Sequence, residues 1–344
     1  MTQHGIRLST FLEHGIDQIF YCWVRRAKTE GLAESFELHK PSEFVKISWT
    51  ETEYTFFKES KYVKPKGLYT VSLRSKELFS YGIFQIITKL PNWKDGPSLW
   101  FGFEADDLFG GGVIHFQYYN GKLRAHVGAW PRPIAMDLTS FALPTDYSST
   151  RHTYSIYIHD GIALWYVDNK LRACALLAHQ DIGEGKIIVD GPPYSLAITS
   201  MLPSTNLAVL LDIDGGDINK EWVWEDFHPW QIRVLPGQPK TILALDLYKH
   251  CSEEQVKKLK LEKEIITHPI PTLPFDKVNL YIKSTEKTNI TIEYLTRNLE
   301  WQEYDKVDSI DHLRYSITDN LTAIRLRIIP TKACKITTAE ALLK

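Results

Sequence analysis

Hydrophobic and polar residues alternate with a period of two along most of the chain between residues 43 and 189. With such alternation, one side chain points towards a core and the next points away from it, which is typical of β-strands. Because the runs are short, rich in β-branched and aromatic residues and separated by turn residues, they predict an all-β sandwich or barrel. The clearest runs are EFVKISWTETEYTFF, GLYTVSLRS, GIFQIITKL, GVIHFQYY, HTYSIYIH, GIALWYVD and KIIVDG.

Turn residues between these runs support the prediction. Asn120-Gly121 and Asp160-Gly161 favour tight hairpins because these residue types reach positive φ at low cost, and Asp168-Asn169 is a weaker signal of the same kind. Near the start, residues 17–26 are predicted as a strand, although the spacing of the neighbouring apolar residues also fits a helix.

A break follows in the segment VLPGQPK at residues 234–240, where two prolines and a glycine stop both strands and helices. The predicted domains are therefore residues 1–236 and 240–344. The second begins with a short helix in CSEEQVKKLKLEKEI, which a serine caps. A smaller β-sandwich follows, with strands VNLYIKST, NITIEYLTR, WQEYDKV, LRYSIT, AIRLRIIP and ITTAEALL.

Charge and composition exclude several classes of partner and site. The chain has 40 Lys+Arg against 42 Asp+Glu, so no net field attracts nucleic acid or anionic lipid. No apolar run approaches the roughly 20 residues of a membrane span, and no signal peptide opens the sequence. The cysteines Cys22, Cys174, Cys251 and Cys334 lie far apart, which argues against a zinc site. No cofactor is required by any motif.

Two segments resemble a known family. RSKELFSYGIFQIITKLP at residues 74–91 resembles the strand motif S-K-x-x-F-x-Y-G-x-F-E-x-R-x-K-L-P of laminarinase-type members of the concanavalin A-like lectin/glucanase superfamily. RHTYSIYIHDGIALWYVDNKL at residues 151–171 is similar to a later strand pair of that family, and PPYSLAI and FHPWQIRVLP fall where it has its late strands. The resemblance covers residues 45–236. It implies a jelly roll of two curved sheets whose concave face binds poly- or oligosaccharide.

The catalytic acids of that family have no counterpart on the corresponding strand. Its enzymes carry E-x-D-x-x-E or E-x-D-x-E there, because retaining glycosidases need two carboxyl groups about 5–5.5 Å apart. In GVIHFQYYNG these positions fall at Val113, His115 and Gln117 or Tyr118, none of which is acidic. Gln85 likewise replaces a glutamate of the fold motif. The predicted function is therefore glycan binding without hydrolysis.

Candidate binding residues lie on the same strand. His115, Gln117 and Tyr119 share one face of a regular strand and would present an imidazole, an amide and a phenol, which suit sugar hydroxyls and C–H faces. For each ring, packing in the core is the alternative interpretation. Candidate aromatic platforms in adjoining segments are Trp93, Trp100 and Trp130.

Two other functions stay open. The chain could be a glycoside hydrolase whose acids have moved into the loop before this strand, at Glu104, Asp106 and Asp107. It could instead be a structural or assembly protein of a surface or virion, since sandwiches also serve protein contacts. The sequence leaves the oligomeric state open.

A calcium site is a further hypothesis. LDIDGGDINKEW places Asp212, Asp214 and Asp217 in a glycine-containing turn, and the resemblance implies a structural Ca²⁺ in many members. The spacing departs from an EF-hand because the later bidentate glutamate is missing. Turn formation is the alternative role of these aspartates, and for His152 a structural role is predicted.

The second domain has a resemblance of its own, and the family resemblance also bears on where the protein is located. That domain loosely resembles carbohydrate-binding-module or galactose-binding-like sandwiches, with candidate contact rings at Tyr281, Tyr294, Trp301 and Tyr304. The family resemblance implies an extracellular or surface protein, whereas the missing signal sequence and the unpaired-looking cysteines favour the cytoplasm.

Overall fold

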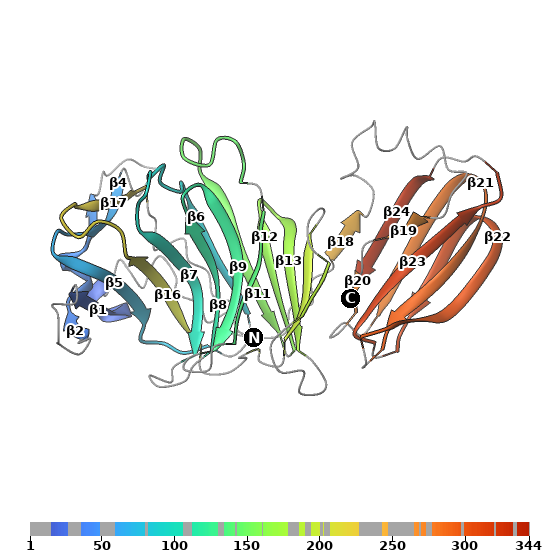
Figure 1. Ribbon diagram of the computed structural model, residues 1–344, viewed down its shortest axis with the longest axis horizontal. Coiled ribbons are helices and arrows are strands. Elements are labelled where there is room, and N and C mark those ends of the chain that lie inside the picture. The colour runs from blue at the N-terminus through green and yellow to red at the C-terminus, as the bar shows by residue number, and fades with distance from the viewer. Residues whose placement is uncertain are drawn as a thin grey trace. The chain divides into compact units, whose positions relative to one another are not determined.

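The fold is seen in a computed structural model (Figure 1). It describes residues 15–26, 36–48, 59–79, 82–105, 112–129, 134–141, 143–159, 161–177, 186–189, 194–199, 202, 207–226, 243–246, 265–267, 270–272, 277–296, 299–319, 321–332 and 336–343. The chain forms two compact units, one from residues 1–159, 163–173 and 201–238 and one from residues 160–162, 174–200 and 239–344.

The largest sheet is an antiparallel sheet of eight strands in the order β10-β9-β8-β7-β16-β5-β1-β2, and Figure 1 shows β7, β8 and β9 side by side. Strand β16 comes late in the chain but lies between β5 and β7, so segments far apart in sequence become neighbours. The strands are β1 (Phe20–Arg26), β2 (Phe36–His39), β5 (Leu68–Ser75), β7 (Ser98–Ala105), β8 (Gly112–Tyr119), β9 (Lys122–Ala129), β10 (Ile134–Phe141) and β16 (Leu207–Asp214).

A second sheet has six strands in the order β14-β15-β13-β12-β11-β6, and a small third sheet has the order β17-β4-β3. The six strands are β6 (Gly82–Thr88), β11 (His152–His159), β12 (Ile162–Val167), β13 (Lys170–Leu177), β14 (Lys186–Val189) and β15 (Ser195–Thr199). The small sheet contains β3 (Val45–Ser48), β4 (Glu59–Lys64) and β17 (Trp222–Glu225). Two short helices accompany them, α2 (Ile16–Ile19) and η1 (Pro41–Glu43).

Aromatic side chains fill the core of the first unit. Phe84 of β6 packs edge-on against Phe103 of β7, with ring centroids 5.8 Å apart. Tyr154 of β11 makes the same kind of contact with Phe101 at 5.7 Å and with Phe116 at 5.8 Å. These five side chains are at most 1% exposed. The predicted sandwich is therefore confirmed as two packed sheets with an aromatic core.

Local predictions from turn residues also hold. Asn120 and Gly121 connect β8 to β9 with φ of 46° and 72°, and Asp168 and Asn169 connect β12 to β13 with φ of 50° and 60°. The strand predicted over residues 17–26 begins later than expected, because α2 occupies Ile16–Ile19 and β1 starts at Phe20. Cys22 and Cys174 are buried free thiols.

The C-terminal strands form a separate seven-stranded sheet, ordered β18-β24-β21-β23-β19, with β20 beside β23 and β22 beside β21. Strand β21 pairs with β24 along its first half and with β23 along its second half. The strands are β18 (Leu243–Asp246), β19 (Ile265–Ile266), β20 (Ile270–Pro271), β21 (Val278–Leu295), β22 (Trp301–Ile317), β23 (Ala323–Pro330) and β24 (Ile336–Leu343).

This second all-β region was predicted, but its strands are longer than the sequence suggested. The first two predicted strands are one continuous strand, β21, and the next two are β22. The predicted helix at residues 251–265 lies almost entirely outside the described residues. The proposed boundary at residues 236–240 lies wholly outside them. Within the described residues, no helix has the length and apolar character to cross a membrane.

Candidate functional site

The face of the eight-stranded sheet that points away from the aromatic core is called here the outer face. Its cross-strand neighbours form a row in which Trp100 lies opposite Gln117 on β8 and opposite Asp212 on β16. Asp212 in turn lies opposite Ser72, and Ser72 lies opposite Trp23 of β1. The strand spacing puts the backbones of the two tryptophans about 14 Å apart. Two tryptophans and the polar residues between and beside them therefore form one row across the sheet.

Three rings pack together on this face. The rings of His115 and His126 stack at 4.7 Å and 10°, and the indole of Trp100 meets His115 edge-on at 4.5 Å. His115 is 1% exposed and His126 is 8% exposed, whereas Trp100 is half-buried. The two imidazoles thus support an indole that remains partly accessible, and His115 itself lies beneath it.

Two glycines make room for this ring cluster. A Cβ atom at Gly102, opposite His115, would lie 2.5 Å from the Ile114 carbonyl oxygen and 2.6 Å from the His115 Cα. A Cβ at Gly128 would lie 2.9 Å from the Nε2 atom of His126. Contacts this short do not occur between real Cβ atoms and their neighbours, so only glycine permits the cluster at both positions.

Unpaired polar atoms concentrate on the outer face. Among the described residues, eight buried side-chain nitrogen or oxygen atoms lack a hydrogen-bond partner, and five of them belong to outer-face residues. They are Arg74 Nε, Trp100 Nε1, both ring nitrogens of His115 and Asp212 Oδ1. Leaving such groups unpaired costs about 1–3 kcal/mol each. The described protein residues supply no hydrogen-bond partner to these five atoms.

Charge on this face is divided between two kinds of carboxyl group. Burial raises the pKa of Asp212 well above its ordinary value, and the nearby Glu104 and Asp214 carboxylates raise it further, against the Ser72 hydroxyl and Arg74, which lower it. Glu104 is instead ion-paired with the Arg74 guanidinium at 3.0 Å. The raised pKa means that Asp212 holds its proton to a higher pH than an ordinary aspartic acid does.

Asp214 belongs to a separate network. The Arg25 guanidinium donates to its carboxylate at 3.1 Å, and Thr70 donates to the same oxygen. Asp217 lies in the turn after β16, where the Asn219 backbone N–H donates to its carboxylate at 2.9 Å. No group of three or more His, Cys, Asp and Glu side chains in the described residues could hold a metal ion. Asp212, Asp214 and Asp217 are not gathered into one such group, and the calcium site stays a prediction.

Other predicted residues fall into four groups. His115, Gln117 and Tyr119 do share the outer face of β8, and Tyr119 is 47% exposed. Trp93 lies elsewhere, with its ring against Trp222 at 5.6 Å. The structural role predicted for His152 agrees with its ring nitrogens, which lie 3.1 and 2.7 Å from the Asp146 and Asp168 carboxylates. Trp130, Asp106 and Asp107 lie outside the described residues.

Three residues of this site were missed by the sequence interpretation. Asp212, Arg74 and His126 stand beside the predicted residues only because β16, β5 and β9 are neighbours of β7 and β8 in the sheet. The alternation in LDID, LRAHVG and LYTVSLRS already placed Asp212, His126 and Arg74 on the same face as the other polar residues of their strands. That signal was available, but the strand order that brings the faces together was not.

Comparisons with known proteins identify related folds only. No family model matches the chain, and no curated protein matches it. Among solved structures it is similar to a β-glucanase of Bacillus licheniformis, with 12% identity, 63% of this chain and 92% of that chain covered, and a TM-score of 0.37. A β-1,3-1,4-glucanase from a mouse hindgut metagenome has 12% identity, covers 69% of this chain and 100% of that chain, and has a TM-score of 0.38.

A third similar structure is the carbohydrate-binding module CBM66 of Bacillus subtilis, with 7% identity, 53% of this chain and 92% of that chain covered, and a TM-score of 0.30. The three structures named here are two β-glucanases and one carbohydrate-binding module. At these identities and TM-scores the similarity is one of fold alone.

Proposed function

We propose that the outer face binds a glycan without hydrolysing it, with the Trp100 ring as its platform. The observation that carries this proposal is a half-buried indole fixed by two stacked imidazoles and surrounded by buried polar atoms without protein partners. A sugar fits this chemistry because its C–H face covers an aromatic ring while its hydroxyls both donate and accept hydrogen bonds.

The neighbours of Trp100 supply the polar contacts. Gln117, opposite it on β8, is half-buried and carries an amide that can donate and accept. On the other side, Asp212 leaves its Oδ1 without a partner. Tyr119 extends the face towards solvent at the end of the same strand. These groups flank the indole on both sides, as an extended saccharide requires.

The test measures binding by the full-length chain. A glycan microarray identifies the oligosaccharide, and titration calorimetry with that oligosaccharide compares the wild type with Trp100→Ala and Gln117→Ala. We expect Trp100→Ala to weaken binding at least about tenfold, because the stacking surface is lost. Tyr157→Ala, at a half-buried aromatic residue of β11 in the six-stranded sheet, is the control and should leave the affinity unchanged. Wild-type affinity in Trp100→Ala, or no bound glycan on the array, would overturn the proposal.

A second candidate function is glycoside hydrolysis, and one observation favours it. Asp212 has a raised pKa while a second carboxylate, Glu104, shares the outer face. Carboxyl groups held in different protonation states are how a general acid and a base are set apart. Against it, Glu104 is already engaged by Arg74. Reducing-sugar release from β-glucans that disappears in Asp212→Asn and Glu104→Gln would replace the binding proposal with this one.

Assembly through protein contacts stays a prediction. It is tested by light scattering of the purified chain, in which a stable oligomer would support it.

A further inference from the structure

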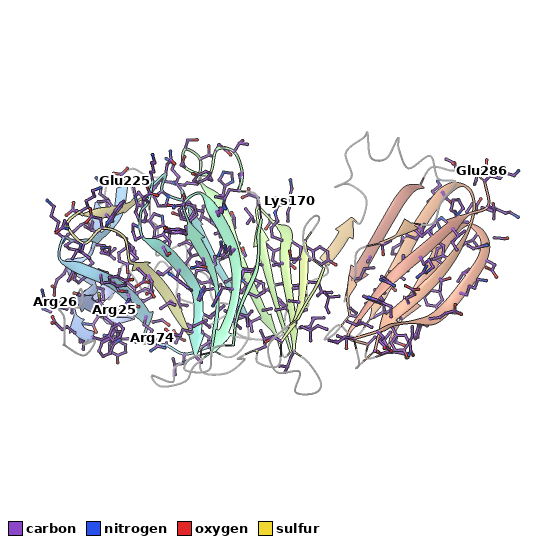
Figure 2. The ribbon with its side chains drawn as sticks, in the orientation of Figure 1. Arg25, Arg26, Arg74, Lys170, Glu225 and Glu286 are labelled. Atoms are coloured by element: carbon purple, nitrogen blue, oxygen red, sulfur yellow. The ribbon has the colours of Figure 1, made fainter. Side chains whose placement is uncertain are left out.

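A cavity lies apart from the outer face. It has a volume of about 680 Å³, within the range of about 300–1,000 Å³ that small-molecule sites occupy. Figure 2 shows Glu225, on its lining, well separated from Arg74 on the outer face. The lining residues that matter here are Lys61, Lys89, Trp93, Arg151, Glu225 and Asp226.

The walls of this cavity are held in place by specific contacts. Asp226 has a φ of 56°, and its backbone carbonyl accepts a hydrogen bond from the Thr88 hydroxyl at 3.3 Å. Its carboxylate joins two segments, since Oδ2 lies 3.0 Å from Lys89 Nζ and Oδ1 lies 2.5 Å from Arg151 Nη2. The cavity therefore has a fixed charged wall before any ligand arrives.

The indole of Trp93 is also fixed. Its ring meets Trp222 edge-on at 5.6 Å. A Cβ atom at Gly96 would lie 2.5 Å from the Trp93 Cβ, so a glycine is required beneath it. The cavity thus combines a rigid aromatic surface with a rigid cluster of charges.

Hydrogen-bond donors exceed acceptors in this lining. Both Asp226 oxygens are engaged by Lys89 and Arg151, and its side chain is 16% exposed. An ammonium carries three donors and a guanidinium five, so each cation keeps donors beyond the one directed at Asp226. Lys89 and Arg151 are 37% and 42% exposed, and Lys61 adds a third cation that is 47% exposed.

The remaining acid does not cancel this excess. Glu225 lies 3.6 Å from Lys61 and is 72% exposed, so the pair is a solvated surface ion pair of little strength. Three cations and two carboxylates line the cavity, and both oxygens of one carboxylate, Asp226, already contact Lys89 and Arg151. The lining therefore favours a ligand that brings negative charge and acceptor oxygens.

We propose that this cavity binds an acidic saccharide, one that carries a carboxylate or sulfate group. The acid group would accept from Arg151, Lys89 and Lys61, and the sugar ring would lie against Trp93. Only the choice of a saccharide rests on the proposed glycan-binding function, while the site, its residues and its preference for an anion are separate from the outer face.

The experiment uses calorimetric titration of the full-length chain with three probes. They are trigalacturonic acid, a sulfated carrageenan tetrasaccharide, and neutral maltotriose. We expect at least one acidic probe to bind and maltotriose not to bind at this cavity. Which acidic probe binds identifies the anionic group, and the affinity should fall as NaCl is raised because the contact is partly exposed.

Site variants locate the binding. Arg151→Gln and Lys61→Gln should each weaken the acidic probe about five- to tenfold, since each removes one charge-assisted contact. Lys170→Gln, which removes an exposed charge elsewhere (Figure 2), is the charge-matched control and should have no effect. Lys61 is exposed enough that its substitution should leave folding intact, so a failure of Arg151→Gln to fold still leaves a test.

Results that overturn this inference differ from those that overturn the proposed function. Acidic-probe binding that is lost in Trp100→Ala but kept in Arg151→Gln and Lys61→Gln would place the ligand on the outer face. Equal affinity for maltotriose would remove the preference for an anion, and no binding of either acidic probe at millimolar concentration would end the inference. Array glycans that depend on Trp100 would be unaffected by any of these outcomes.

Discussion

The two faces of the eight-stranded sheet differ in how completely their side chains are satisfied. On the core face, Phe101 and Phe116 stack at 5.2 Å and are fully buried. On the outer face, the next residues along the same strands, Trp100 and His115, carry buried nitrogens without protein partners. Adjacent residues of one strand thus have different roles. One packs between the sheets, and its neighbour faces away from the core, where it can bind a ligand.

The largest effect should come from the core face. Replacing Phe101 by alanine should lower the free energy of unfolding by about 3–5 kcal/mol, because a fully buried ring leaves a cavity. Denaturant unfolding measures this loss. Trp100→Ala, one residue away on the outer face, should cost clearly less while abolishing glycan binding. Equal costs for the two variants would contradict the division of labour between the faces.

Gly102 couples the two faces, and its substitution should have the next largest effect. Gly102→Ala forces the new Cβ against β8 and should destabilise the protein by about 1–3 kcal/mol through overpacking. Because His115 must shift, glycan affinity should fall as well, as calorimetry would detect. Gly67→Ala is the control, since Gly67 also has positive φ but no atom within 4 Å of the added Cβ. A loss no greater than that of the control would mean that crowding at Gly102 is unimportant.

Two residues of the outer face, His115 and Asp212, should make the free energy of unfolding depend on pH in opposite directions. Burial and the neighbouring His126 lower the pKa of His115, so the unfolded chain takes up a proton that the native state resists, and stability falls as pH drops below about 6.5. The raised pKa of Asp212 means that the native state keeps a proton that the unfolded chain loses, so stability falls as pH rises above about 3.8.

Variants separate these two contributions. Unfolding free energy measured against pH should lose part of its acid-side fall in His115→Phe, and Asp212→Asn should remove part of the fall on the alkaline side. His312→Phe, at an exposed histidine of β22, is a control for the first variant. If the dependence of unfolding free energy on pH were unchanged in both variants, the pKa values of His115 and Asp212 would not be shifted as their surroundings imply.

The smallest effect on stability should come from the rim of the outer face. Tyr119 is 47% exposed, so Tyr119→Ala should change the free energy of unfolding by no more than about 0.5 kcal/mol. Glycan affinity should still fall, by less than in Trp100→Ala. A stability loss as large as that of Gly102→Ala would show that Tyr119 belongs to the packing and not to the ligand surface.

Local chemistry made part of the fold predictable. Strand alternation identified β8 correctly, and the Asn120-Gly121 signal correctly predicted the turn that follows it, because side-chain direction and turn geometry depend on adjacent residues. The shared face of His115, Gln117 and Tyr119 follows from the same period of two. Such features need no knowledge of distant parts of the chain.

The rest of the site depends on sheet order, which no local pattern contains. Asp212 was interpreted as a calcium ligand because its near neighbours in sequence are aspartates, yet in the sheet it lies opposite Trp100. The need for glycine at Gly102 arises from the adjacent strand, and the charged cavity joins segments that are far apart in the chain. These relations appear only when the strands are placed side by side.

Strand β21 has three partners, since β22 pairs with it along both halves while β24 pairs with its first half and β23 with its second. Loss of either β24 or β23 would leave part of β21 without that partner, although the same continuous strand pairs with the other. We therefore expect this C-terminal sheet to melt in one cooperative step, with amide hydrogens at the two ends of β21 exchanging at matched rates.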